Sequence, residues 1–306
     1  TQNYNTGITT PSDPSDPTGY TFGGWKSNIA RTTTYTFPTN MPDYGADGAT
    51  KNVYAKFNPI QYSATFSPVA GGGVQYVRPV YDAEMPALGY IELVGGYTLT
   101  PPSESGYDFR GYYASEDGVG SNYYDANMDP VDTWDQANSA TIHAWFDIKN
   151  YCFEFHMNEG DAIGDLCYNF GDTITEPTTP TLTGYTFGGW KSDAGLTTTF
   201  TFPSTMPDYG ATGAYKNVYT KWNIESYTIH SIDGDFTDIT QNYNTAVTTP
   251  SDPSRTGYTF GGWKSNIART TTYTFPGTMP DYGSNGATKN IYSKWTPITY
   301  YPILSP

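Results

Sequence analysis

The sequence predicts a mainly β protein made of tandem small modules arranged as an extended rod. One phrase recurs: GYTFGGWKSNIARTTTYTFP occupies residues 19–38 and 257–276, and a close variant occupies residues 184–203. Residues 106–118 carry a degraded copy, GYDFRGYYASEDG. The chain contains 29 Tyr, 32 Gly and 23 Pro, so strand-favouring aromatic residues are punctuated by turn formers. A recurring phrase indicates a repeated structural unit rather than one active-site domain.

The module boundaries follow from the spacing of this phrase. Trp25, its counterpart Tyr112, Trp190 and Trp263 lie 87, 78 and 73 residues apart. Each interval is long enough for one small domain of marginal stability. We predict a first module lacking its first strand, a divergent second, and a third and fourth that are regular, at residues 1–58, 59–149, 150–224 and 225–296. Residues 297–306 are then the first strand of a following module, or a donor strand.

Composition and charge exclude several classes of function. The formal net charge is −15 and the isoelectric point is about 4.3, with no basic stripe that could displace counterions from phosphate. We therefore expect no nucleic-acid partner, and the same charge disfavours an anionic membrane surface. No stretch approaches the roughly 20 apolar residues of a membrane span, and none has sustained helical spacing.

The fourth module shows the expected order of elements most clearly. Residues 227–232 alternate apolar and polar side chains, and Asp233-Gly234 is a strong signal for a two-residue hairpin that returns through residues 236–243. A Pro-rich crossing follows at residues 248–257, where the prolines cannot donate ladder hydrogen bonds. The sequence therefore predicts a hairpin followed by an irregular crossing.

The repeated phrase begins with a strand that contains a glycine pair. Tyr258 and Phe260 stand at alternate positions and are expected to face one side of the strand. Gly261-Gly262 permits a bulge or a close backbone approach before Trp263.

The closing strand at residues 290–295 places Ile291 and Trp295 on one face, which we predict to point inward. Small β modules need large rings to build a core. The residues assigned to the module cores are Tyr20, Phe22, Trp25, Tyr185, Phe187, Trp190, Tyr258, Phe260 and Trp263. On the other face of the closing strands we expect exposed or inter-module contacts, or stacking on sugars, from Tyr54, Tyr219 and Tyr292.

The two ends of the chain are offset by one strand. Residues 1–14 match residues 240–253, so the first module lacks the strand that residues 227–239 supply in the fourth. Residues 297–306 resemble the opening of the second module. Two explanations remain open: excision from a longer array, and head-to-tail completion, in which residues 298–304 of one chain fill the empty strand position of the next. The inter-subunit strand would then use Ile298, Tyr300 and Ile303.

The two cysteines, Cys152 and Cys167, flank a turn near Glu159-Gly160. A two-residue turn there would set them directly opposite each other on paired strands, within disulfide range at a non-hydrogen-bonded pair. We predict that bond, and with it an oxidising compartment. Two buried free thiols are the alternative. The other three modules contain no Cys, so a disulfide does not define the module.

Signals for catalysis are weak. His143, His156 and His230 lie in strand-like runs without a recognised nucleophile motif, and we interpret them as ordinary strand residues. No zinc-like cluster of Cys or His is present in the sequence.

Acidic residues gather in two places. Asp129, Asp132 and Asp135 would suit a glycosidase only if two carboxyls faced each other across a cleft, and a solvated acidic loop is the simpler interpretation. The loop DYGADG at residues 43–48 has the alternating oxygens of a calcium loop, but its two counterparts lose the second acid and no bidentate Glu follows. We interpret it as a turn capped by Asp and Gly, and we expect no cofactor or metal.

The phrase GYTFGGWKSD, a later T-Y-T-F-P and a closing V-Y-x-K-W at residues 218–222 resemble the Listeria-Bacteroides repeat, the module of internalin B-repeats and of many bacterial surface proteins. The first, third and fourth modules carry this pattern. The second departs from it, with Arg110 and Tyr112 in place of Gly and Trp. The resemblance implies a small β-grasp-like domain that serves as a stalk or spacer in secreted or wall-attached proteins, and it implies no catalytic residues.

We therefore expect a non-catalytic structural segment of a secreted bacterial surface adhesin, stalk or fibre, outside the cell. Its expected partners are further copies in a head-to-tail polymer, neighbouring repeats of a longer chain, or cell-wall or host glycans. The alternative is an adhesin module whose divergent second repeat recognises a carbohydrate or protein. An enzyme is the least favoured class.

Overall fold

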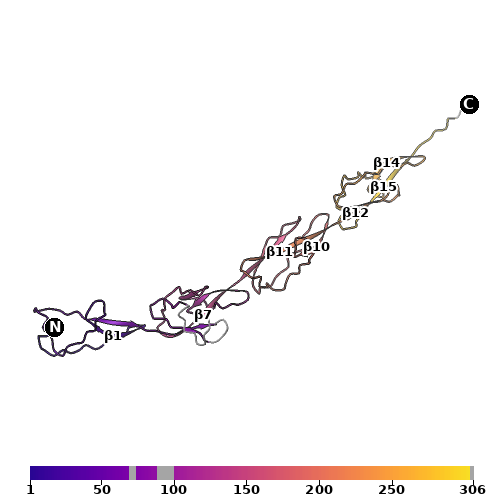
Figure 1. Ribbon diagram of the computed structural model, residues 1–306. Coiled ribbons are helices and arrows are strands. Elements are labelled where there is room, and N and C mark those ends of the chain that lie inside the picture. Colours follow the sequence, from indigo (N-terminus) through magenta and orange to yellow (C-terminus); the bar gives the residue numbers. More distant parts are fainter. Residues whose placement is uncertain (69–73, 88–99, 304–306) are drawn as a thin grey trace. The chain divides into compact units, whose positions relative to one another are not determined.

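A computed structural model describes residues 1–68, 74–87 and 100–303 of the chain (Figure 1). All regular elements among these residues are β-strands, and each of the four sheets falls, to within one residue, inside the range predicted for one module. The chain divides into two compact units, Thr1–Lys149 and Asn150–Pro306. The described part holds no helix with the length and apolar character needed to cross a membrane. Leu304, the last residue of the expected inter-subunit strand, lies outside the described residues, as do the two that follow it.

The first module contains a two-stranded antiparallel sheet of β1 (Tyr20–Lys26) and β2 (Tyr54–Pro59). β1 is labelled at the indigo end of Figure 1. None of the apolar side chains of residues 1–58, all of which the structure describes, is buried. The edge of β2 away from β1 has no strand paired to it among the described residues. This module is therefore two strands short of the sheets in the third and fourth modules.

The second module contains a five-stranded sheet in the order β4-β3-β7-β5-β6. Its strands are β3 (Ala64–Ser67), β4 (Tyr76–Val77), β5 (Tyr107–Tyr113), β6 (Asn122–Asp125) and β7 (Ala140–Ile148). The central pair, β3 and β7, is parallel, and the other pairs are antiparallel. Its core is rich in rings, and includes Phe66, Tyr112, Tyr123, Tyr124 and Trp134.

The third and fourth modules share one topology. The third consists of β8 (Asn150–His156), β9 (Leu166–Asn169), β10 (Tyr185–Lys191) and β11 (Ala214–Ile224). The fourth consists of β12 (Ser226–Ser231), β13 (Ile239–Asn242), β14 (Tyr258–Lys264) and β15 (Thr288–Pro297), with β14 beside β15 in Figure 1. In both, the first strand pairs antiparallel with the second and parallel with the last, and the last pairs antiparallel with the third. Each sheet has its own cluster of buried residues.

The glycine pair forms the predicted bulge. The register between β14 and β15 shifts between Phe260 and Trp263, and the same shift occurs at the equivalent positions of β1 and β10. Gly262 has a φ of +86°, which side-chain-bearing residues rarely adopt. In the second module Arg110 replaces the first glycine, while Gly111 keeps a positive φ of 137° and the register still shifts. The bulge therefore needs the second glycine of the pair.

The hairpin of the fourth module differs from the prediction of a two-residue turn at Asp233-Gly234. β12 and β13 are antiparallel as expected, but residues 232–238 form the loop between them. Asp233 Oδ2 accepts a hydrogen bond from the backbone N–H of Ser293 at 2.7 Å, and Phe236 turns into the core. These tertiary contacts hold the chain away from a tight turn.

Candidate functional site: the module junctions and the disulfide

The tryptophans of the repeated phrase differ in burial. Trp190 and Trp263 are 4 % and 6 % exposed, whereas Trp25 is half-buried. Each packs edge-on against the phenylalanine of its own strand, with ring centroids 5.5, 5.1 and 5.0 Å apart for Phe22, Phe187 and Phe260. These phenylalanines, and the tyrosines that open the phrase (Tyr20, Tyr185 and Tyr258), are half-buried. The nine residues assigned to module cores thus divide into two buried indoles and seven rings at the core boundary.

The three indole N–H groups also differ. Trp190 Nε1 donates to Glu176 Oε1 at 3.0 Å. The Nε1 atoms of Trp25 and Trp263 are buried and have no hydrogen-bond partner among the described residues. The fourth module has Thr249 at the position of Glu176, so no carboxylate reaches its indole. A buried donor without a partner costs stability.

The tyrosines expected to be exposed are half-buried: Tyr54, Tyr219 and Tyr292. The Tyr219 ring stacks on His156 with centroids 4.5 Å apart. The Arg269 guanidinium lies 5.7 Å from the centre of the Tyr292 ring. Neighbours from the same module therefore cover part of the ring surface of Tyr219 and Tyr292.

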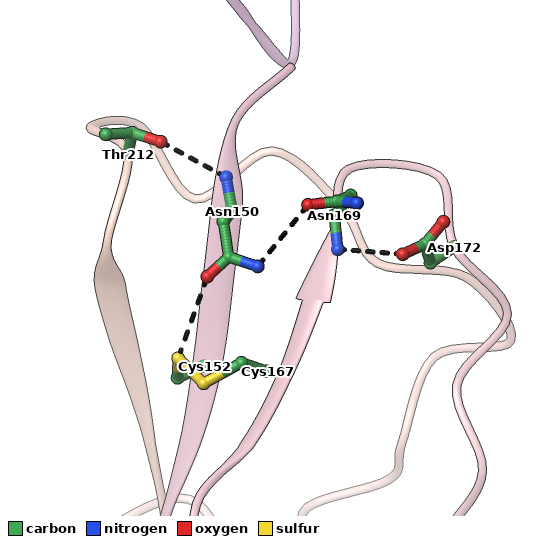
Figure 2. The surroundings of a disulfide bond; sticks show 6 residues. All are labelled: Asn150, Cys152, Cys167, Asn169, Asp172 and Thr212. Atoms are coloured by element: carbon green, nitrogen blue, oxygen red, sulfur yellow. Dashed lines mark hydrogen bonds between the residues drawn. A yellow bond between two sulfur atoms is a disulfide. The ribbon is translucent and has the colours of Figure 1, made fainter. Parts of the chain in front are cut away.

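Cys152 and Cys167 form a disulfide (Figure 2). The two residues face each other across β8 and β9, with their Cα atoms 4.1 Å apart. The register is the one predicted from a turn at Glu159-Gly160. The strands, however, end at His156 and begin again at Leu166, so a longer loop replaces the two-residue turn. Asn150, beside the disulfide in Figure 2, donates through Nδ2 to Asn169 Oδ1 at 3.4 Å.

The three histidines lie in strands, as predicted: His143 in β7, His156 in β8 and His230 in β12. His230 Nδ1 lies 2.8 Å from the Asp238 carboxylate, and this hydrogen bond holds the pKa of Asp238 below its ordinary value. No group of three or more His, Cys, Asp or Glu side chains in the described ranges is arranged to hold a metal ion.

The acidic residues of the second module support its core. Asp135 accepts hydrogen bonds from the hydroxyls of Tyr123 and Ser121 and from Gln136 Nε2. Burial opposes ionisation of this carboxyl, but the hydrogen bonds outweigh it, and the pKa of Asp135 lies below its ordinary value. Trp134 beside it is fully buried, so the segment contributes to the core.

The DYG loops are turns closed by aspartate. The Oδ1 atoms of Asp43, Asp208 and Asp281 accept from the backbone N–H two residues later at 2.7, 2.8 and 2.6 Å. This geometry matches the turn interpretation of these loops.

The third and fourth modules meet at Gly184, directly before β10. The Tyr243 ring covers this glycine so closely that a Cβ on Gly184 would lie 2.1 Å from it. The Gly184 carbonyl accepts from Glu225 N at 2.9 Å, and Tyr243 N donates to the Glu225 carbonyl at 2.8 Å. Tyr185 meets Tyr243 edge-on, with centroids 6.1 Å apart. Only glycine fits beneath the ring.

Two carboxylates, of Glu225 and Asp281, accept hydrogen bonds at this junction. Glu225 is 8 % exposed and accepts from a threonine hydroxyl of β10 at 2.8 Å and from the Tyr227 hydroxyl. The Tyr227 hydroxyl also lies 2.8 Å from Asp281 Oδ1. The backbone N–H of Gly283, the Tyr227 hydroxyl and the backbone N–H of Gly184 lower the pKa of Asp281 against the opposing effect of burial. A carboxylate of the fourth module therefore lies close to the covered glycine of the third.

The first and second modules meet in the same way at Gly19. A Cβ on Gly19 would lie 2.2 Å from the Tyr81 ring, and Tyr20 meets Tyr81 edge-on at 5.5 Å. Ile60 N donates to the Gly19 carbonyl and Tyr81 N donates to the Ile60 carbonyl, both at 2.9 Å. Here the polar contact runs from the Tyr20 hydroxyl to Asp82 Oδ2 at 3.0 Å, which raises the pKa of Tyr20.

The equivalent glycine of the fourth module is uncovered. Ile298 N donates to the Gly257 carbonyl at 2.9 Å, as at the other two junctions. No described atom beyond its chain neighbours lies within 4 Å of the Cβ position of Gly257. Ile298, Tyr300 and Ile303, expected in the inter-subunit strand, are 42 %, 76 % and 92 % exposed.

Sequence reasoning missed these junctions. A glycine precedes the strand in all four copies of the phrase, at Gly19, Gly106, Gly184 and Gly257, and this recurrence was the available signal. The ring that covers it comes from a separate phrase about one module further on, so spacing within the repeat does not reveal the contact.

Comparison with known proteins identifies the repeated unit. Residues 1–56, 151–212 and 227–285 match the Listeria-Bacteroides repeat domain family. The chain is similar to a putative membrane protein of Evansella cellulosilytica, with 27 % identity over 80 % of this chain and 33 % of the relative. A putative Gly-rich membrane protein of the same organism is 26 % identical over 91 % of this chain and 30 % of the relative. Internalin H of Listeria monocytogenes is 37 % identical over 30 % of this chain and 16 % of its own length.

The chain thus spans a third or less of the length of these curated relatives. The three family matches fall on the first, third and fourth modules and together cover more than half of the chain. The protein therefore belongs to the Listeria-Bacteroides repeat domain family.

Proposed function

We propose that this chain is a non-catalytic structural segment of a bacterial surface adhesin, stalk or fibre, made of β-grasp-like modules arranged as an extended rod. The observation that carries the proposal is that the third and fourth modules each close a four-stranded sheet over their own core and meet at a buried ring-over-glycine contact. The central parallel pair between two antiparallel pairs supports the β-grasp-like assignment. Modules that contact only their neighbours suit a spacer.

The short connection at the junction supports the same function. A single residue, Glu225, separates β11 from β12, and it is buried and hydrogen-bonded to both modules. A connection of this length leaves little freedom for bending. The names of the relatives, internalin H and two putative membrane proteins, support a location on the bacterial cell surface.

Small-angle X-ray scattering of the monomeric chain tests the stalk. A compact protein of this length has a radius of gyration of about 19 Å. We expect a value well above this. A value near it would contradict a rod, and would leave the family assignment unaffected.

The proposal includes head-to-tail assembly by strand complementation. In the fourth module Thr228 of the first strand faces Thr240 of the second. Ile298 and Glu225 donate the same backbone hydrogen bond to the glycine that precedes their phrase strand, so the two residues are equivalent. Three residues further on, Tyr301 is then equivalent to Thr228, and Thr1 is equivalent to Thr240 in the matching phrase. Residues 298–303 of one copy would then pair with the open edge of β2 in the next.

Cysteine trapping tests this register. One copy carries Thr1→Cys and the other carries Tyr301→Cys, and the two are mixed with oxidised glutathione. We expect disulfide-linked dimers on a non-reducing gel. The control, Gln2→Cys in place of Thr1→Cys, shifts the thiol to the other side of the strand and is expected to give far less product. Equal yields, or none, would contradict strand complementation.

A second candidate function is recognition of a carbohydrate or protein by the divergent second module. The observation that favours it is that residues 57–150 fall outside the family match. Val119 and Val131 of this module are 65 % and 53 % exposed. Binding of the whole chain to a glycan array, lost on Val119→Asp with Val131→Asp and retained on Ile29→Asp, would support this candidate. No binding to glycans or to bacterial surface extracts would count against it.

A further inference from the structure

We propose that the fourth module carries a docking surface for a second copy of this chain, and that Tyr4 of that copy covers Gly257. We call Gly257, Tyr258 and Ile298 the open junction surface. The inference rests on the proposed head-to-tail assembly and adds the side-chain contact that fixes its register.

Two filled examples define the contact. At Gly19 and at Gly184 the ring of a following tyrosine occupies the space where a Cβ would lie, and both glycines are buried. At both junctions one linking residue makes two backbone hydrogen bonds. Its N–H donates to the glycine carbonyl, and its own carbonyl accepts from the tyrosine N–H. The same three-part arrangement in two places indicates a rule for joining successive modules.

The open junction surface already has its half of this arrangement. The Ile298 N–H is bonded to the Gly257 carbonyl, as Glu225 is to Gly184 and Ile60 is to Gly19. Gly257 has a φ of +81°, close to the +79° and +76° of Gly19 and Gly184. Beyond its chain neighbours, no described atom lies within 4 Å of its Cβ position, and Tyr258 beside it is half-buried. The described residues supply every part of the arrangement except the covering ring.

The opening phrase of the chain presents such a ring. Residues 1–6 and 240–245 are identical, and Tyr4 is the counterpart of Tyr243. Asn5 N donates to the Met41 carbonyl at 2.9 Å, as the residue after Tyr243 does to the equivalent methionine at 2.8 Å. Asn5 has a φ of 56°, and its counterpart has a φ of 58°.

Tyr4 is therefore held by the same turn as Tyr243, but it is 73 % exposed. Covering Gly257 would bury this ring, and buried aromatic anchors dominate binding energies. A second copy of this chain fits as the partner, because its turn, phrase and tyrosine match those of the filled examples.

Sedimentation equilibrium of the full chain tests the contact. Tyr4→Ser removes the ring, and Gly257→Ala places a Cβ where the ring would lie. We expect wild type to form a concentration-dependent series of oligomers. Each variant alone is expected to associate at least about tenfold more weakly, in the range of a lost aromatic hot spot. An equimolar mixture of the two variants retains one intact surface of each kind, so it is expected to form dimers and nothing longer.

The matched control is Gly286→Ala, which lies in the same module and has the same φ of +81°. Beyond its chain neighbours, no described atom lies within 4 Å of its Cβ position. It imposes the same backbone strain away from the surface, and we expect wild-type association. Tyr4→Ser introduces no strained backbone, so it keeps the test valid if both alanine variants unfold. Three results would overturn the inference: a strictly monomeric wild type, wild-type association by Tyr4→Ser, or a mixture that forms no dimer. If Tyr4→Ser associates normally and the cysteine trap still forms, strand complementation stands and the ring contact alone is wrong.

Discussion

The first and fourth modules contain the same phrase, at residues 19–38 and 257–276, but bury it to different extents. In the fourth module Trp263, Phe275 and Met279 are 6 %, 8 % and 0 % exposed. Their counterparts in the first module are all half-buried: Trp25, Phe37 and Met41. Identical local sequence therefore forms the same strand and bulge in both places, and does not by itself form a core.

The difference comes from the first hairpin. In the fourth module β12 and β13 bring Tyr227, Ile229 and Phe236 against the phrase. The first module has no such strands, so Trp25 packs against Phe22 and Phe37 without a hairpin to cover the three rings. Burial of the phrase is thus decided by a segment about thirty residues away. The first test below breaks or sharpens this comparison, and the other three extend it to the third and fourth modules.

The largest expected effect comes from removing the two tryptophans in turn. Trp263→Ala should lower the free energy of unfolding of its module by about 3–5 kcal/mol, the cost of deleting a buried aromatic ring. Trp25→Ala should cost about 1 kcal/mol, since its ring is already partly in water. Hydrogen exchange resolved by module measures both, because several modules do not share one unfolding transition.

A matched variant sharpens this test. If residues 226–239 are added ahead of Thr1, Trp25→Ala should become as costly as Trp263→Ala, because the missing hairpin would bury the ring. Equal costs in the unmodified chain would contradict the account of burial given above.

The third module differs from the fourth in having a disulfide. Thr228 and Thr240 occupy the positions of Cys152 and Cys167, face each other in the same register, and place their Oγ1 atoms 2.8 Å apart. Replacing both threonines by Cys should stabilise the fourth module by about 3 kcal/mol, the effect expected for a loop of about 12 residues. Thermal unfolding with and without reductant measures the gain. If reduction leaves both modules unchanged, the disulfide makes no contribution to stability.

The indole N–H gives a smaller difference between the same two modules. Thr249→Glu should supply Trp263 with the acceptor that Glu176 supplies to Trp190, and so stabilise the fourth module by about 1 kcal/mol, the net value of a typical intramolecular hydrogen bond. Thr249→Gln is the uncharged control, with a smaller gain. Urea unfolding followed by indole NMR would detect it, and an unshifted indole N–H resonance would contradict the proposed bond.

The smallest effect concerns acid sensitivity. The backbone N–H groups of Thr198 and Thr197 lower the pKa of Asp193 to about 2. The ionised Asp193 carboxylate therefore stabilises the third module fully at a pH above its ordinary pKa of 3.8, and this effect is lost as the pH falls through about 2. Asn266 makes the equivalent bonds in the fourth module with a neutral amide. Asp193→Asn should remove this acid-dependent loss in the third module, measured by melting between about pH 5 and pH 1. A pH profile unchanged by the substitution would contradict the assignment.

Local patterns in the sequence were enough for the strands, the bulge and the cysteine register. Alternation places Ile291 inward, and the glycine pair predicts the shift before Trp263. The turn at Asp233-Gly234 was predicted wrongly because Ser293, sixty residues away, binds Asp233. The cover over Gly184 could not be predicted either, since it depends on a tyrosine from the next module. Local patterns do not reveal contacts between residues that lie far apart in the sequence.

The central parallel pair has a mechanical consequence. In the third and fourth modules the first strand, which receives the incoming chain, lies beside the last strand, which leads onward, and the two run in the same direction. Tension applied at the two ends of such a module would slide these neighbours past each other, so their shared hydrogen bonds must rupture together instead of unzipping one after another. The first module has no such pair among the described residues, and is expected to yield at the lowest pulling force.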